Sequence, residues 1–340
     1  MTPEEILAYW MLKSRDLIKI ASTVPYRPSY LQSLNITTFK PITTTEVTVQ
    51  VQAPGKLALI QTTERGGPIE QDTPKSGDLR VLPTFRLAKG ATIRSHELRD
   101  VVMFGEGTVK KRIGAELAER FAAIDEDMTL TEEHMLMGAV QGIIMDADGT
   151  TPLLDCFTEF GAPARATINL DWANWTIGDA RKFFNNLKRE MTREMTGLSG
   201  RGKMIALCGD QAYDDLVTAP AVEKLYASHS GARELEKIGQ AYESFPFAGI
   251  EWHNYRGTDD MTTIKIPDNE VRFFPAGVKD LFLDVRAPGE TISDLSVKGK
   301  RRNPVMLRDK DRDFWMKAEQ YTYPSYVCTR PGVLRKGVLV

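Results

Sequence analysis

An extended stretch with strict alternation stands out near the N-terminal end of the chain. Residues 45–52 (TEVTVQVQ) place apolar and polar side chains on opposite faces, which is the period of a half-buried strand. A turn is predicted at Pro54-Gly55, and the following KLALIQTT carries a matching apolar face. Residues 64–78 (ERGGPIEQDTPKSGD) are polar and rich in Gly and Pro, so they are predicted to form a loop tip before LRVLPTFRL returns toward the body.

A two-stranded arm of this kind is marginally stable by itself in water, so its apolar face requires a partner. The partner is either the arm's own domain, if the hairpin folds back, or a neighbouring subunit. On the second interpretation the contact candidates are Val47, Val49, Val51, Leu57, Leu59, Arg65, Gly66 and Gly67.

Helix-spaced apolar residues lie on both sides of this arm. Residues 2–18 read as an amphipathic helix, and a long helix is predicted from an apolar stripe of Val109, Ile113, Leu117, Phe121, Ile124 and Met128. Thr129 and Glu132 have the spacing of a capping box, which predicts a break and a restart, continued by Met137, Val140 and Ile144. The helix should end near Gly142, before a strand, a tight turn at Asp148-Gly149 and a second strand.

From about Trp175 the chain alternates between helix and strand. A helix is predicted over 176–197, with an apolar stripe of Ile177, Ala180, Phe184, Leu187, Met191 and Met195. A buried strand is predicted at MIALCG (204–209), and a helical segment over 210–228 that breaks at Pro220. FPFAGIEWHNYRG, MTTIKIP and EVRFFPAG read as strands. The tail from Phe314 to Val340 is extended, with its prolines restricting it to edges or bulges.

Composition narrows the possible functions. The chain has 340 residues, 42% hydrophobic and 26% charged, with a net charge of −2. These values are ordinary for a globular protein and argue against a dedicated nucleic-acid binder, which has a basic excess. No apolar run approaches the roughly 20 residues that span a bilayer. Three scattered cysteines and four scattered histidines form no metal-ligand spacing, so we expect a reducing compartment, no membrane, no metal and no cofactor.

Residues 197–204 (GLSGRGKM) have the Gly-x4-Gly-Lys spacing of a phosphate-binding loop. A working loop of this type follows a strand and opens a helix, whereas here a helix precedes it and a strand follows. Met204 also stands where Ser or Thr would hold magnesium. The stretch is therefore interpreted as a connecting loop, and we predict no catalytic residue, although a nucleotide-binding enzyme stays as the alternative from a different class.

A basic run, Lys298, Lys300, Arg301 and Arg302, precedes a strip of alternating charges at 308–313. The run is interpreted as solvated and paired with that strip. Weak, non-specific contact with packaged DNA is the other possibility.

Four stretches, taken in order, resemble one protein family. MDADGTTPLLDCFTEFG, MIALCGDQAYDDLVTAPAVEKLY, FPFAGIEWHNYRG with IPDNEVRFFPAG, and PSYVCTRPGVLRKG are similar to the bacteriophage major capsid protein E family, whose type member forms the shell of phage lambda. The resemblance runs from about Met1 to Val340.

The resemblance implies an α+β fold of the tailed-phage, Hong Kong 97-type capsid class. It implies an N-terminal arm (1–40), an extended E-loop hairpin (41–95), a peripheral domain with a long spine helix (96–174), an α/β axial domain (175–305) and a C-terminal strand returning to the peripheral domain (306–340). Nothing in the chain supports autocatalytic cross-linking.

The function implied is that of a non-enzymatic major head protein. It would self-assemble into hexamers and pentamers of an icosahedral shell around double-stranded DNA, in a virion or prophage product assembled in the host cytoplasm. Scaffold and maturation protease would be separate proteins, a portal would be a further partner, and a decoration protein is possible. An encapsulin-like compartment shares the fold and is the nearest alternative.

Overall fold

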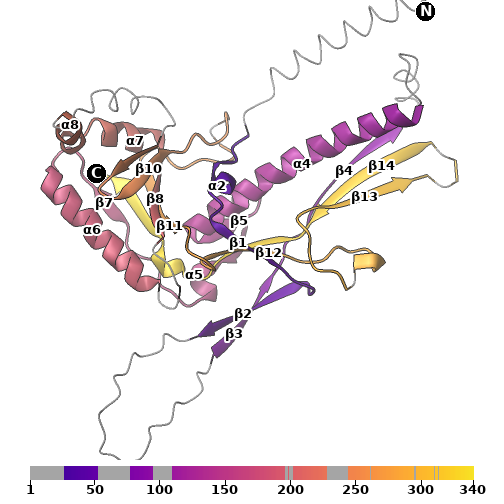
Figure 1. Ribbon diagram of the computed structural model, residues 1–340, viewed down its shortest axis with the longest axis horizontal. Helices are drawn as coiled ribbons and strands as arrows, with labels where there is room; N and C mark the ends of the chain where they lie inside the picture. Colours follow the sequence, from indigo (N-terminus) through magenta and orange to yellow (C-terminus); the bar gives the residue numbers. More distant parts are fainter. Residues whose placement is uncertain are drawn as a thin grey trace, which may run out of the picture.

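The computed structural model describes residues 27–52, 77–94, 109–195, 198, 202–227, 244–260, 262–294, 296–309, 311–312 and 314–340. The helix predicted at 2–18 lies outside these residues. Within them the chain is a mixture of helices and sheets, with one helical and sheet-rich lobe at one end and a long helix flanked by ribbons at the other (Figure 1).

A six-stranded sheet forms the first lobe, in the order β7-β16-β11-β8-β10-β9. Its strands are β7 (Ile168–Leu170), β8 (Lys203–Cys208), β9 (Ser244–Phe247), β10 (Ile250–Asn254), β11 (Glu270–Ala276) and β16 (Arg335–Leu339). β10 pairs parallel to β8 and β7 parallel to β16, while the remaining neighbours are antiparallel. The strands predicted at 204–209, 245–257 and 270–277 are confirmed.

Helices α6 (Ile177–Glu194), α7 (Asp210–Val217) and α8 (Pro220–Ala227) cover one face of this sheet. The predicted apolar stripe of α6 is confirmed, with Phe184 fully buried and in ring contact with Trp252 of β10. Tyr213 of α7 contacts Phe245, which lies directly opposite Trp252 and therefore points to the same side. The break predicted at Pro220 separates α7 from α8.

The second lobe is built on α4 (Val109–Gln141), a helix of 33 residues, which is about 50 Å long at 1.5 Å per residue. Ile124 and Met128 of the predicted stripe are buried, as are Met137, Val140 and Ile144. Phe121 is half-buried against a small cluster of Ile93 and Ala318. The side chains of 109–117 lie outside the described part.

The break predicted at Thr129 is wrong, because α4 continues through it. The hydroxyl groups of Thr129 and Thr131 donate to the carbonyls of Asp125 and Asp127, four residues earlier, so they bond within the helix instead of capping a new one. Glu132 is used in a tertiary contact described below. The helix ends as predicted before Gly142, whose φ of +90° is a left-handed conformation.

Three small sheets surround α4. They are β1 (Thr37–Pro41), β12 (Phe282–Arg286) and β15 (Pro324–Cys328); β4 (Leu87–Arg94), β14 (Trp315–Thr322) and β13 (Asn303–Arg308); and the pair β5 (Ile143–Met145) and β6 (Pro152–Asp155). The β4-β14-β13 sheet runs alongside α4 away from the first lobe (Figure 1). Short helices α2 (Tyr30–Ser33), α5 (Cys156–Glu159), η1 (Ile292–Asp294) and η2 (Pro331–Val333) connect these parts.

The arm strand β2 (Glu46–Gln52) is confirmed, and among the described residues it has a partner that the sequence analysis did not assign to it. It pairs with β3 (Gly77–Pro83), in register from Glu46 opposite Pro83 to Gln52 opposite Gly77. The predicted partner at 56–63 and the turn at Pro54-Gly55 lie outside the described residues. The register places Leu82 of β3 opposite Val47, so these two buried side chains share the inner face of the ribbon.

MTTIKIP (261–267) was predicted as a strand, and its described residues form turns instead. Asp260 accepts hydrogen bonds from the backbone N–H groups of Thr262 and Thr263 and from nearby hydroxyls, which holds the chain in a bend. Ile264 and Ile266 are buried from this irregular segment. Local side-chain hydrogen bonding has overridden the β-propensity of the sequence.

Sheet membership crosses the predicted domain boundaries in two places. β12, within the predicted axial range of 175–305, pairs with β1 and β15 beside α4. β16, predicted to return to the peripheral domain, is an interior strand of the six-stranded sheet. Gly337 allows this, since a Cβ there would lie 2.8 Å from Leu170 of β7. The domain ranges themselves stay predictions.

Candidate assembly surfaces and the contacts that position them

The base of the arm is tied to its own chain. Val47 is 8% exposed and Leu82 is fully buried, and both belong to the main core, with Val49 packed against it. The valine face is therefore covered at its base by the chain's own domain, which leaves Val47 little surface for a neighbour. The side chain of Val51 lies outside the described part, as do Leu57, Leu59, Arg65, Gly66 and Gly67.

The opposite face of the arm carries exposed apolar side chains. Leu79 and Val81 of β3 are 64% and 56% exposed, and they lie opposite Gln50 and Thr48 of β2. Sequence reasoning missed this face because it took the apolar side from residues 45–52 and 56–63 and assigned no face to LRVLPTFRL. The signal was present in LRVLP, where residues 79 and 81 alternate with 80 and 82.

A second exposed apolar set lies at the far end of the β13-β14 ribbon. Met306, Leu307 and Phe314 are exposed, and Trp315 begins β14 beside them. β13 is an edge strand of its sheet, so this set lies next to unpaired backbone groups. Met306 and Leu307 are consecutive in β13 and face opposite sides of the ribbon. Each side of this end therefore carries exposed apolar surface of the kind found at protein-protein contacts.

A buried charge cluster joins α4 to strands β12, β14 and β15. Arg286 of β12, 1% exposed, donates to Glu132 of α4 at 2.6 Å and to Asp284 at 2.5 Å. It also donates to the hydroxyls of Thr322 and Tyr326, each at 2.7 Å. Burial by itself lowers the pKa of Arg286, but Tyr326 and the two carboxylates outweigh it, so the pKa lies above the ordinary value.

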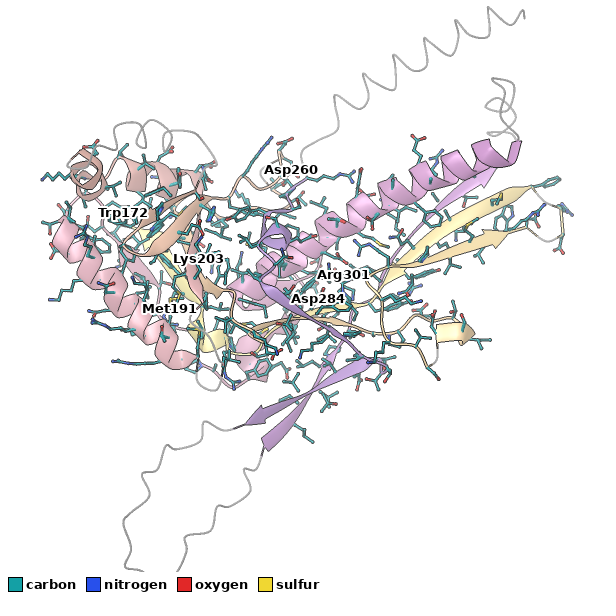
Figure 2. The ribbon with its side chains drawn as sticks, viewed as in Figure 1. Trp172, Met191, Lys203, Asp260, Asp284 and Arg301 are labelled. Carbon is teal, nitrogen blue, oxygen red and sulfur yellow. The ribbon has the colours of Figure 1, made fainter. Side chains whose placement is uncertain are left out.

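The cluster extends into the basic run. Arg302 donates to Glu132 at 2.6 Å and also pairs with Asp125 of α4. A guanidinium nitrogen of Arg301 lies 3.4 Å from the carboxylate of Asp284 (Figure 2). The guanidinium also lies over the Phe39 ring. The interpretation of this run as a self-paired strip is thus wrong for its two arginines, which bind acidic groups on α4 and β12. Lys298 and Lys300 are exposed.

Glu133, next to Glu132, connects a different set of elements. Its carboxylate accepts from the backbone N–H groups of Leu31 at 2.8 Å and Gln32 at 3.2 Å, and from the Tyr255 hydroxyl at 3.3 Å. It therefore joins α2, α4 and the segment that follows β10. Burial raises the pKa of Glu133 above its ordinary value, against the lowering effect of these hydrogen bonds.

The Gly-x4-Gly-Lys stretch has the order predicted from sequence, since α6 ends at Glu194 and β8 begins at Lys203. No helix N-terminus follows the glycines to face a phosphate. Lys203 is paired with Glu251 of β10 at the surface. Among the described residues there is no group of three metal-ligating side chains, and no helix is long and apolar enough to cross a bilayer.

Comparison with known proteins adds an independent result. The family model described as phage major capsid protein E matches residues 13–339. No curated protein sequence matches the chain.

Solved structures match in fold at low identity. A protein described as the capsid protein of a prophage in Escherichia coli CFT073 is 10% identical, with a TM-score of 0.56, over 93% of this chain and 94% of that chain. The capsid of cyanophage P-SCSP1u is 10% identical, with a TM-score of 0.53, over 94% and 90%. The capsid of Myoviridae phage XM1 is 11% identical, with a TM-score of 0.51, over 94% of both.

Proposed function

The chain belongs to the phage major capsid protein E family, and from this premise we propose how it builds a shell. Copies associate into hexamers and pentamers that close into an icosahedral head around double-stranded DNA. One chain must then occupy several non-equivalent positions, which requires repeated contacts between elements that can adjust to one another.

The observation that carries the assembly proposal is the exposed face of β3. Leu79 and Val81 are more than half exposed on a ribbon whose other face is already tied to the core. A two-stranded ribbon with an apolar outer face is marginal in water. A neighbouring subunit covers this face in our proposal, and Val49, Val51, Leu57, Leu59, Arg65, Gly66 and Gly67 remain the other contact candidates.

Further partners follow from the family and stay proposals. A scaffold, a maturation protease and a portal act as separate proteins, and a decoration protein binds the outer surface if the shell has one. Assembly takes place in the host cytoplasm, and the product is the virion. The net charge of −2 suits a wall that contacts DNA weakly, with the exposed Lys298 and Lys300 as contact candidates.

The test places a charge on each face of the same strand. Leu79→Asp with Val81→Asp should leave the monomer folded and abolish particles, because only the outer face is changed. Leu82→Asp, on the inner face, should instead unfold the arm's base, since Leu82 is fully buried. Asn269→Asp is the charge control, an isosteric change at an exposed residue of the six-stranded lobe, and should do neither.

Circular dichroism melts report folding, and sedimentation with electron microscopy reports particles. Wild-type particles that protect DNA from nuclease support a phage head, whereas particles that enclose an enzyme support an encapsulin-like compartment. Closed particles from the Leu79/Val81 variant would show that this face is not an intersubunit contact.

A further inference from the structure

The solvent face of α6 is basic. Four of its exposed residues are cationic (Arg181, Lys182, Arg189 and Arg193), against two exposed acidic residues, Asp179 and Glu190. By the helical period, Lys182, Arg189 and Arg193 lie opposite the buried stripe of Phe184 and Met191, whereas Arg181 lies on its flank. This face therefore presents a row of positive charge along the flank of the first lobe.

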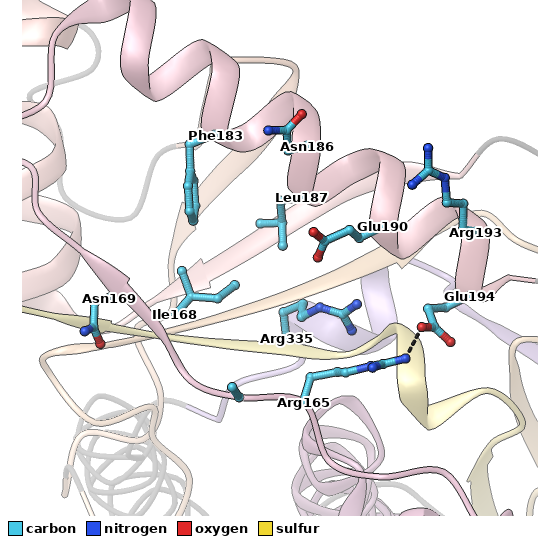
Figure 3. Close-up of a pocket in the computed structure, with 11 residues that line it drawn as sticks. Arg165, Ile168, Asn169, Phe183, Asn186, Leu187, Glu190, Arg193, Glu194 and Arg335 are labelled. Carbon is cyan, nitrogen blue, oxygen red and sulfur yellow. Dashed lines mark hydrogen bonds and ion pairs between the residues drawn. The ribbon is translucent and has the colours of Figure 1, made fainter.

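A hollow of about 660 Å³ lies beside the C-terminal half of α6. Arg165, Arg193, Arg335, Glu190 and Glu194 line it, over an apolar floor that includes Leu187 (Figure 3). Arg165 pairs with Glu194. Arg335 is only 6% exposed, and burial and the nearby Arg165 lower its pKa against the opposing effect of Glu194 and Glu190. The hollow thus carries three arginines against two glutamates.

A second flank of the same lobe is acidic. Asp214 and Asp215 of α7 and Glu223 of α8 are exposed, Asp210 is half-buried at the start of α7, and Lys224 is the neighbouring cation. α6 runs along one side of the helical layer, and α7 and α8 lie at another (Figure 1). One lobe thus carries two surfaces of opposite charge that face in different directions.

We propose that the basic face of α6 and its hollow receive the acidic α7-α8 face of a second copy of this chain. Two different surfaces in contact make a head-to-tail interface, which closes into a ring when each copy is rotated by the same angle about an axis. Complementary charge sets the register of such a contact and disfavours wrong pairings. The inference rests on the proposed function, since it identifies the contact by which copies surround a capsomer axis.

A second copy fits the α6 face better than a nucleic acid does. Glu190 and Glu194 border the hollow and would repel a phosphate backbone, whereas individual carboxylates on a helix can meet the arginines between them. The complementary surface is also present on the same lobe at equal copy number. DNA binding by the α6 face is an outcome that the experiment separates.

The experiment reverses charges on each face. The first variant carries Lys182→Glu and Arg189→Glu, and the second carries Asp214→Lys and Asp215→Lys. All four residues are exposed, so each variant should keep the wild-type melting temperature. Each variant by itself should assemble at least tenfold less than wild type at low salt, because like charges then meet across the contact. The chain that carries all four substitutions should recover most of the wild-type yield.

Mixing the two folded variants is the sharper test. In a ring where the two variants alternate, the reversed α6 face of one meets the reversed α7-α8 face of the other, and the two native faces meet at the next contact. Opposite charges then face each other at every contact. An equal mixture should therefore form hexamers, whereas a pentamer must contain a mismatched contact. Lys265→Glu with Lys279→Glu, at exposed lysines outside these helices, is the matched control and should assemble like wild type.

Analytical ultracentrifugation and negative-stain microscopy measure the products. Variants that assemble like wild type, or a mixture that fails to assemble although both components are folded, would overturn the proposed contact while leaving the shell function intact. Loss of DNA binding in the first variant, with assembly unchanged, would assign the α6 face to nucleic acid instead. A wild-type protein that forms no particles would overturn the shell function itself.

Discussion

Replacing Arg286 with Met should cost the folded chain about 3–5 kcal/mol, which is the cost of breaking a buried ion pair by removing one partner. The Glu132 and Asp284 side chains are 6% and 3% exposed, so neither carboxylate can be solvated in exchange. Glu132 still has Arg302 at 2.6 Å in the variant, which limits the free-energy cost at the Glu132 carboxylate. Among the described residues, Asp284 keeps the more distant Arg301, at 3.4 Å, so most of the cost should arise at Asp284.

The matched control is Arg301→Met. It also removes a positive charge that pairs with Asp284, but Arg301 lies at the surface. The Arg301 side chain is 63% exposed, and exposed ion pairs contribute about 0–1 kcal/mol. Arg286→Lys should lie between the two, because an ammonium keeps the charge but cannot reach four acceptors in a plane.

Urea unfolding of the unassembled protein, followed by tryptophan fluorescence and far-ultraviolet circular dichroism, measures these differences in unfolding free energy. The midpoints can be compared directly when the variants have the same m-value, the slope of free energy against urea concentration. If Arg286→Met and Arg301→Met shift the midpoint equally, the buried cluster contributes no more than a surface pair, and the reasoning is refuted.

Four further outcomes can be measured on the same material. Burial raises the pKa of Glu133 in the folded state. The contribution of Glu133 to stability is therefore fully present below its pKa in the unfolded state, about 4.3, and is lost as the pH rises through its pKa in the folded state. Glu133→Gln should therefore flatten the pH dependence of the urea midpoint between pH 4 and 8. A pH dependence equal to that of the wild type would show that Glu133 is not the group responsible. Gly142→Ala should lower stability by more than about 1 kcal/mol in thermal melts, since a Cβ there would lie 2.3 Å from Phe157 at a φ of +90°; a neutral result would contradict that geometry. Phe184→Ala should cost about 3–5 kcal/mol of unfolding free energy, because the ring is fully buried, and a much smaller loss would mean that the site collapses around the deletion. Lys203→Ala should leave calorimetric titrations with ATP unchanged and flat; micromolar binding that the substitution removes would revive the enzyme alternative.

Local periodicity was sufficient for most individual elements. The stripe through Phe184 and Met191 placed α6 and its buried face, and the apolar run at 204–208 placed β8. Pro220 marked the boundary between α7 and α8. These features depend on neighbours a few residues apart, and a side chain's face is set by the helix or strand period alone. The order of four motifs was in addition specific enough to indicate the family.

The tertiary structure decided which elements meet. Val47 and Val49 marked an apolar face, but only the pairing of β2 with β3 showed that this face is covered at its base and that Leu79 and Val81 are the uncovered pair. Glu132 fitted a helix cap locally and was drawn instead into a contact with Arg286, 154 residues away in sequence. Strand partners and buried charge pairs depend on which surfaces remain available after the helices and sheets pack. That information is distributed over the whole chain, so no window of the sequence contains it.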